Sequence, residues 1–185
     1  MSASRESRSK RKKELNKLAV ARSDISNAQK TCRVILERVS GLGDELYAPL
    51  FYAAVVSYGR PFVDNKSTGP LSRHWGEFPS TRLRQTHAKL IKTRHELVAH
   101  SDVNVRAAEI IPRGVPAAPT LPPSEYVGLR IASYYYPQSM FIDAFDTCAN
   151  IIGRLNSRID TLLSALYDGQ EIPDRPFPLT FDDGL

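Results

Sequence analysis

The sequence predicts a mainly α fold, an antiparallel four-helix bundle that carries a small β-hairpin insertion. Four segments have apolar residues at the three- and four-residue steps of an amphipathic helix. Most links between these segments are short, which favours helices that pack antiparallel to their neighbours. Two short runs of β-forming residues lie between the third and fourth segments, on either side of a Pro-rich connection.

The first helix is predicted over residues 10–39, where apolar side chains recur from Leu15 to Val39 and Gly41 ends the pattern. The second is predicted over residues 44–58, with Asp44 as its N-cap and a Gly-Arg-Pro turn as its stop.

The third helix follows a loop. It begins at Ser80 or Thr81 and ends near residues 100–102.

The β-forming runs, residues 107–111 and 126–133, predict a hairpin insertion over about residues 105–134. The last helix starts at Pro137, has the most regular apolar spacing in the chain, and ends at Gly169. Its apolar positions are Phe141, Phe145, Cys148, Ile152, Leu155, Ile159, Leu162 and Leu166.

Composition divides the chain into three parts. Residues 1–13 contain six basic residues and one acidic residue, Glu6, so their net charge is +5, equal to that of the whole chain. They are predicted to form a disordered basic arm. Residues 14–167 form the predicted bundle with its insertion, and residues 168–185 form an acidic, Pro-containing tail. A basic arm favours a polyanionic partner such as nucleic acid, although a solvated leader fits it equally well.

Several classes of protein do not fit this composition. Hydrophobic residues make up 42% and charged residues 24%, which is ordinary for a soluble globular protein. No segment is long and apolar enough to span a membrane, and no apolar core follows the basic N-terminus. We therefore expect a cytoplasmic location, no membrane partner and no secretory signal.

The sequence offers no recognisable metal or cofactor motif. It has no CxxC, no HExxH and no Gly-rich phosphate loop, and His95 and His100 are out of phase for sharing a metal ion on one helix. No metal and no cofactor are therefore expected. Cys32 and Cys148 each fall on an apolar stripe, which predicts two buried free thiols.

One charged residue interrupts the apolar face of the predicted third helix. That face is formed by Leu83, Leu90, Ile91, Leu97 and Val98. Arg94 points close to its centre, and a guanidinium cannot shed its charge, so burying it unpaired costs several kcal/mol. Either a carboxylate meets it, such as Asp143 or Asp146 of the last helix, or this face lines a groove that binds an anion.

The segment around Arg94 resembles a known motif. Arg94 and His100, with five residues between them, fit the Rx4–6H signature of the HEPN superfamily (higher eukaryotes and prokaryotes nucleotide-binding), in which a polar residue, here His95, follows the arginine. Residues 97–102 and the turn at 57–62 also resemble bacterial HEPN-like proteins of the phage-defence AbiV type. The resemblance covers the predicted bundle, while the hairpin and the basic arm depart from it.

The resemblance implies an antiparallel HEPN bundle that acts as a metal-independent endoribonuclease in phage defence, abortive infection or a toxin–antitoxin pair. Two protomers would pack so that both Arg–His pairs line one composite cleft. His100 would transfer the proton of the RNA 2′-OH, Arg94 would hold the phosphate, and His95 would orient the phosphate or a catalytic group. The implied products are a 2′,3′-cyclic phosphate and a 5′-hydroxyl. The implied partners are RNA, a second copy of the chain, and an antitoxin or other regulatory protein.

Three further residues are candidates for binding substrate. Arg60 is either a second cation at the cleft or an ordinary residue at a helix C-terminus. Lys92 adds charge to an already basic helix, and Glu96 either orients His100 or forms a surface pair.

Two other functions stay open from the sequence. One is a catalytically inactive HEPN-like module that holds a nucleotide, RNA or protein. The other is a basic scaffold or regulator that binds DNA through residues 1–13.

Overall fold

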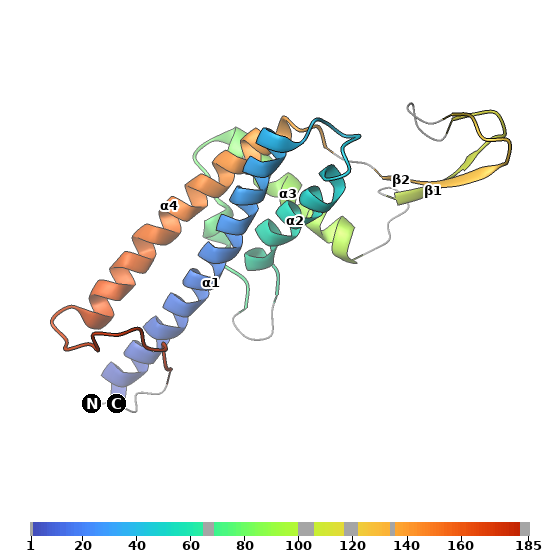
Figure 1. Cartoon of the computed structure of the whole chain (residues 1–185). Helices are drawn as coiled ribbons and strands as arrows, with labels where there is room; N and C mark the ends of the chain where they lie inside the picture. The colour runs from blue at the N-terminus through green and yellow to red at the C-terminus, as the bar shows by residue number, and fades with distance from the viewer. Residues whose placement is uncertain (1, 65–68, 100–105, 117–121, 134–135, 182–185) are drawn as a thin grey trace.

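The computed structural model describes residues 2–64, 69–99, 106–116, 122–133 and 136–181 (Figure 1). This part of the chain contains four α-helices, two short 3-10 helices and one two-stranded antiparallel sheet. The elements are α1 (Ser2–Arg38), α2 (Tyr47–Gly59), η1 (Arg60–Phe62), η2 (Arg73–Gly76), α3 (Thr81–Ala99), β1 (Arg106–Ile111), β2 (Gly128–Ser133) and α4 (Met140–Tyr167). The predicted mainly α fold with a small hairpin is confirmed.

The two long helices α1 and α4 lie side by side and run in opposite directions (Figure 1). The shorter helices α2 and α3 pack at one end of this pair, α2 against α1 and α3 against both α2 and α4. The core between the long helices is apolar because both of them carry a buried stripe. From α1 it includes Leu18, Ile25, Cys32 and Ile35, and from α4 it includes Phe141, Cys148, Ile151, Leu155 and Leu162. Both cysteines are buried and free, as predicted.

Helix α1 begins at Ser2, whereas the sequence predicts a disordered arm over residues 1–13. No glycine or proline precedes Gly41, so nothing in the sequence ends the helix early. Arg8 also ties this segment to the far end of α4, because its Nη2 donates to the backbone oxygen of Leu166 at 3.4 Å and to the side chain of Gln170 at 2.7 Å. Lys10, Arg11 and Lys13 are exposed along this helix, whereas Lys12 is buried.

The acidic tail returns alongside the start of α1 (Figure 1). The Ser9 hydroxyl donates to the backbone oxygen of Phe181 at 3.2 Å, and the rings of Tyr167 and Phe177 are 6.0 Å apart. These contacts bring the acidic segment close to the basic end of the helix.

The sequence predicts Asp44 as the N-cap of the second helix, and this prediction is wrong. Helix α2 begins at Tyr47, and no side chain forms a capping hydrogen bond at its start. The Asp44 carboxylate instead accepts hydrogen bonds from the backbone N–H groups of Ser40 and Leu46, both at 2.9 Å. These bonds lower the pKa of Asp44, because they favour its charged form. The residue therefore fixes the turn between α1 and α2.

The hairpin projects from the helical body (Figure 1). Its strands pair antiparallel, with Glu109 opposite Arg130 and Ile110 opposite Leu129. Ile110 and Leu129 are both exposed.

His87 on α3 lies in an aromatic pocket. Its Nδ1 is 2.7 Å from the hydroxyl of Tyr58, and its ring lies 4.8 Å from that of Phe62 and 5.6 Å from that of Phe78. Burial lowers the pKa of His87 from 6.5 to about 4. The neutral imidazole therefore helps to join α2, α3 and the segment between them.

This pKa makes stability depend on pH. Below pH 6.5 His87 is protonated in the unfolded chain, but in the folded protein it stays neutral down to about pH 4. The free energy of unfolding therefore falls as the pH drops through this range. After allowance for partial solvent screening, we expect His87 to account for a loss of about 2 kcal/mol in the free energy of unfolding between pH 7 and pH 4.5. Urea denaturation at both pH values measures it. His87→Gln should remove this part of the slope, whereas His95→Gln, at an exposed position, should not. Equal slopes for wild type and His87→Gln would contradict the prediction.

Candidate functional site

Arg94 crosses the end of α2 at a point where that helix has no side chain. A Cβ atom placed on Gly59 would lie 2.6 Å from Arg94 Cγ and 3.0 Å from Arg94 Cβ. The glycine thus lets α2 and α3 approach closely, and the aliphatic stem of the arginine fills the space. This packing fixes the direction in which the guanidinium leaves the helix.

Arg94 lines a pocket of about 320 Å³ between α1 and the segment that follows α2. Three cations line it, Lys17, Arg60 and Arg94, together with the carboxylates of Asp24 and Asp64. Arg60 Nη1 lies 3.5 Å from Asp24 Oδ1, while the Arg60 side chain stays largely exposed. Counted over the described residues, the lining of the pocket therefore has an excess of one positive charge, and the pocket has room for a small anion.

Arg94 is not paired with Asp143 or Asp146, the two acids of the last helix that the sequence offered as examples of a partner. Arg82 binds both of those acids, Asp143 through Nη1 and Asp146 through Nη2 at 2.8 Å. Within the part of the chain that the structure describes, the buried Nε of Arg94 has no hydrogen-bond partner. A polar group in this state is costly unless something outside the described residues binds it.

The other predicted site residues divide between this pocket and the surface. Arg60 shares the pocket with Arg94. Lys92 and Glu96 form a pair with each other, with Lys92 Nζ 3.6 Å from Glu96 Oε1, and His95 is exposed. None of these three residues lines the pocket. His100 lies outside the described residues, so the structure gives no geometry for the Arg94–His100 pair.

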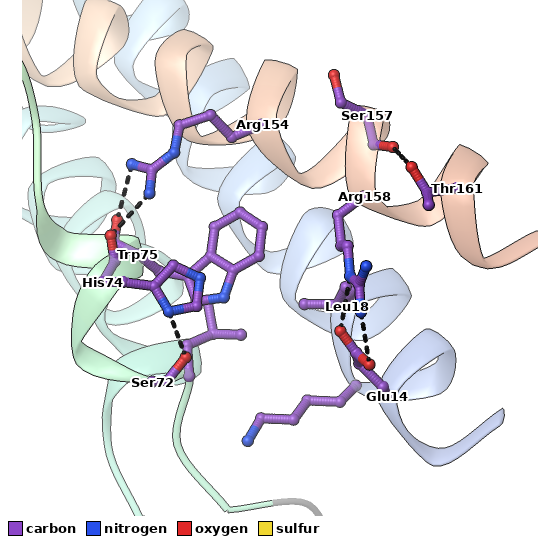
Figure 2. Close-up of a pocket in the computed structure, with 11 residues that line it drawn as sticks. Glu14, Leu18, Ser72, His74, Trp75, Arg154, Ser157, Arg158 and Thr161 are labelled. Atoms are coloured by element: carbon purple, nitrogen blue, oxygen red, sulfur yellow. Dashed lines mark hydrogen bonds and ion pairs between the residues drawn. The ribbon is translucent and has the colours of Figure 1, made fainter. Parts of the chain in front are cut away.

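A second and larger pocket, of about 750 Å³, lies between α1, α4 and the loop that contains η2 (Figure 2). Sequence reasoning missed it. Lys17 and Leu71 line both pockets, so the two are neighbours on one surface. Two aromatic residues, His74 and Trp75, are adjacent in the loop, and this pair is the signal that the sequence offered.

Among the described residues, no cluster of three or more His, Cys, Asp or Glu side chains is suited to hold a metal ion. None of the helices in the same part of the chain is both long and apolar enough to cross a membrane. Comparisons of the chain with models of protein families, with curated proteins and with solved structures found no match.

Proposed function

We propose that this chain is a metal-independent endoribonuclease of the HEPN type, which acts as a homodimer in a phage-defence or toxin–antitoxin system. The proposal rests on the resemblance of Arg94 and His100 to the HEPN motif and on the state of one side chain. Arg94 leaves a helix into a pocket, with its Nε buried and unpartnered among the described residues. An RNA phosphate is the kind of anion that a guanidinium binds through two parallel hydrogen bonds.

The proposed chemistry divides between two residues. His100 takes the proton from the 2′-OH of the RNA as that oxygen attacks the adjacent phosphorus, since an imidazole titrates near neutral pH. Arg94, with Arg60 beside it, stabilises the charge that develops on the non-bridging oxygens. The bond to the 5′ oxygen of the next nucleotide then breaks, which leaves a 2′,3′-cyclic phosphate and a 5′-hydroxyl. A second protomer supplies another Arg–His pair to the same cleft, and an antitoxin or other regulatory protein restrains the enzyme in the cytoplasm.

RNA cleavage in the presence of EDTA tests this function. We expect the purified protein to cut single-stranded RNA at full rate without metal and to leave the two ends named above, which end-labelling and mass spectrometry identify. His100→Ala should abolish cutting. An RNA that carries 2′-O-methyl groups should bind but remain intact, because it has no free nucleophile. Loss of activity on chelation, or 5′-phosphate products, would count against the proposal.

One observation favours the inactive binding module as the second candidate. Asp24 and Asp64 line the same pocket, and Asp24 is within ion-pair distance of Arg60. A carboxylate there competes with a phosphate for the cation. Tight binding of RNA by wild type, with no cut product, would favour this module over the nuclease.

A further inference from the structure

The larger pocket has an apolar floor and polar walls (Figure 2). Leu18 of α1 and Leu71 and Trp75 of the loop form the floor, and all three are buried. Lys17 of α1 and Arg158 of α4 also line the pocket. Arg158 is paired with Glu14, its Nε 2.8 Å from Glu14 Oε1 (Figure 2), and Lys17 Nζ donates to the backbone oxygen of Pro70 at 2.5 Å. The pocket thus combines an apolar surface with positive charge, which suits a ligand that has both a flat apolar body and an anionic group.

The loop that forms one wall is held in place by α4. The guanidinium of Arg154 donates to the backbone oxygen of His74 at 2.7 Å (Figure 2) and lies 5.3 Å from the ring centre of Trp75. It also donates to the backbone oxygen of Glu77 at 2.8 Å. Together with a third hydrogen bond, to the backbone oxygen of Trp75 at 3.3 Å, these bonds satisfy three backbone carbonyl groups of the loop. The wall is therefore formed before any ligand arrives, which lowers the entropy cost of binding.

His74 gives this wall an aromatic surface. Its ring packs against that of Trp75 at 5.0 Å, and its Nδ1 lies 2.9 Å from the hydroxyl of Ser72, so the imidazole has a fixed orientation (Figure 2). The residue itself is exposed, which leaves it available to a second ring. Stacking on such a ring is the usual way in which proteins hold the bases of single-stranded nucleic acid.

The opposite wall offers hydrogen-bond acceptors. The Ser157 hydroxyl donates to Gly153 O at 3.1 Å, and the Thr161 hydroxyl donates to Ser157 O at 2.9 Å. With their protons committed to the helix backbone, both oxygens present lone pairs to the pocket. Amino and imino groups of a base, or the hydroxyls of a ribose, are donors of the kind that they would accept.

We propose that this pocket binds a nucleotide of a single RNA strand, with the base stacked on His74 and the phosphate towards Lys17. The inference rests on the proposed function and deepens it. Because Lys17 and Leu71 line both pockets, a strand that places one phosphate at Arg94 passes over residues 69–72 to reach this one. The nucleotide held here fixes the position of the strand relative to the proposed cleavage site.

Trp75 makes the pocket directly observable, because it is the single tryptophan of the chain. Titration of the full-length protein with adenosine 5′-monophosphate should change the tryptophan emission in a saturable way. His74→Ala removes an exposed side chain and should raise the Kd by at least about fivefold, the lower end of the range for one stacked base. Arg22→Ala is the matched control, since Arg22 lies on α1 outside both pockets and should leave the Kd unchanged.

A second ligand separates the contribution of the base from that of the sugar and phosphate. Ribose 5-phosphate lacks the base and should bind far more weakly than the nucleotide, with an affinity that His74→Ala does not alter. If the emission fails to change with the nucleotide, or if ribose 5-phosphate binds as tightly, the pocket is no nucleotide site. Such a result leaves RNA cleavage untouched. Conversely, saturable binding by a protein that never cuts RNA would support the pocket and overturn the nuclease.

Discussion

Replacing Arg94 with methionine is expected to lower RNA cleavage by about 10²- to 10³-fold, the usual effect of removing one donor that stabilises a transition-state charge. The free energy of unfolding should stay the same or rise slightly. Methionine keeps the aliphatic stem that packs on Gly59, and it removes a buried Nε that has no partner among the described residues. Single-turnover cleavage and urea denaturation of the same preparations measure the two quantities.

Two other variants make this result specific. Arg94→Lys keeps the charge but loses the planar fork, so it should recover only part of the activity. Arg22→Met removes an exposed arginine of α1 outside the pocket and should change neither quantity. If Arg94→Met instead unfolds the protein, with a loss of about 3–5 kcal/mol, the arginine belongs to a buried ion pair and the catalytic role is wrong.

The fold could be predicted where one segment alone decides the structure. Helix α4 carries its own apolar period and has clear stops, and most of its predicted apolar positions are buried, from Phe141 to Leu166. The start of α1 could not be predicted, because it depends on contacts between Arg8 and residues 166–170 at the other end of the chain. The role of Asp44 failed for a related reason, since a good capping residue can equally well bind the N–H groups of a turn.

The same distinction holds for the site. The position of Arg94 on an apolar face is a local property, and helical spacing was enough to find it. The environment of Arg94 is not local. Arg82 binds the two acids of α4 that could have paired with Arg94, and Gly59, on which its stem packs, belongs to another helix. The larger pocket depends on Arg154, which holds a loop about 80 residues away in the sequence. No pattern within one segment contains such a pairing.

Gly59→Ala is expected to lower cleavage by about 100-fold, although Gly59 itself does not line the pocket. The new Cβ would lie 2.6 Å from Arg94 Cγ and 3.0 Å from Arg94 Cβ. The second of these atoms is fixed by the backbone of α3, so the stem cannot simply swing aside, and the two helices must separate. Overpacking of this kind costs about 1–3 kcal/mol, more than the gain in helix propensity of about 1 kcal/mol. Cleavage assays and thermal unfolding measure both effects.

Gly153→Ala is the matched control for this prediction. Gly153 lies inside α4, and, apart from its chain neighbours and the adjacent backbone of its own helix, no atom of the described residues comes within 4 Å of the added Cβ. The same change of residue should therefore stabilise the protein by about 0.5–1 kcal/mol and leave cleavage as it was. If Gly59→Ala loses stability but cuts RNA like wild type, then the placement of the guanidinium against α2 does not matter for the reaction. Loss of cleavage by Gly59→Ala alone would instead tie activity to the close approach of two helices at a single glycine.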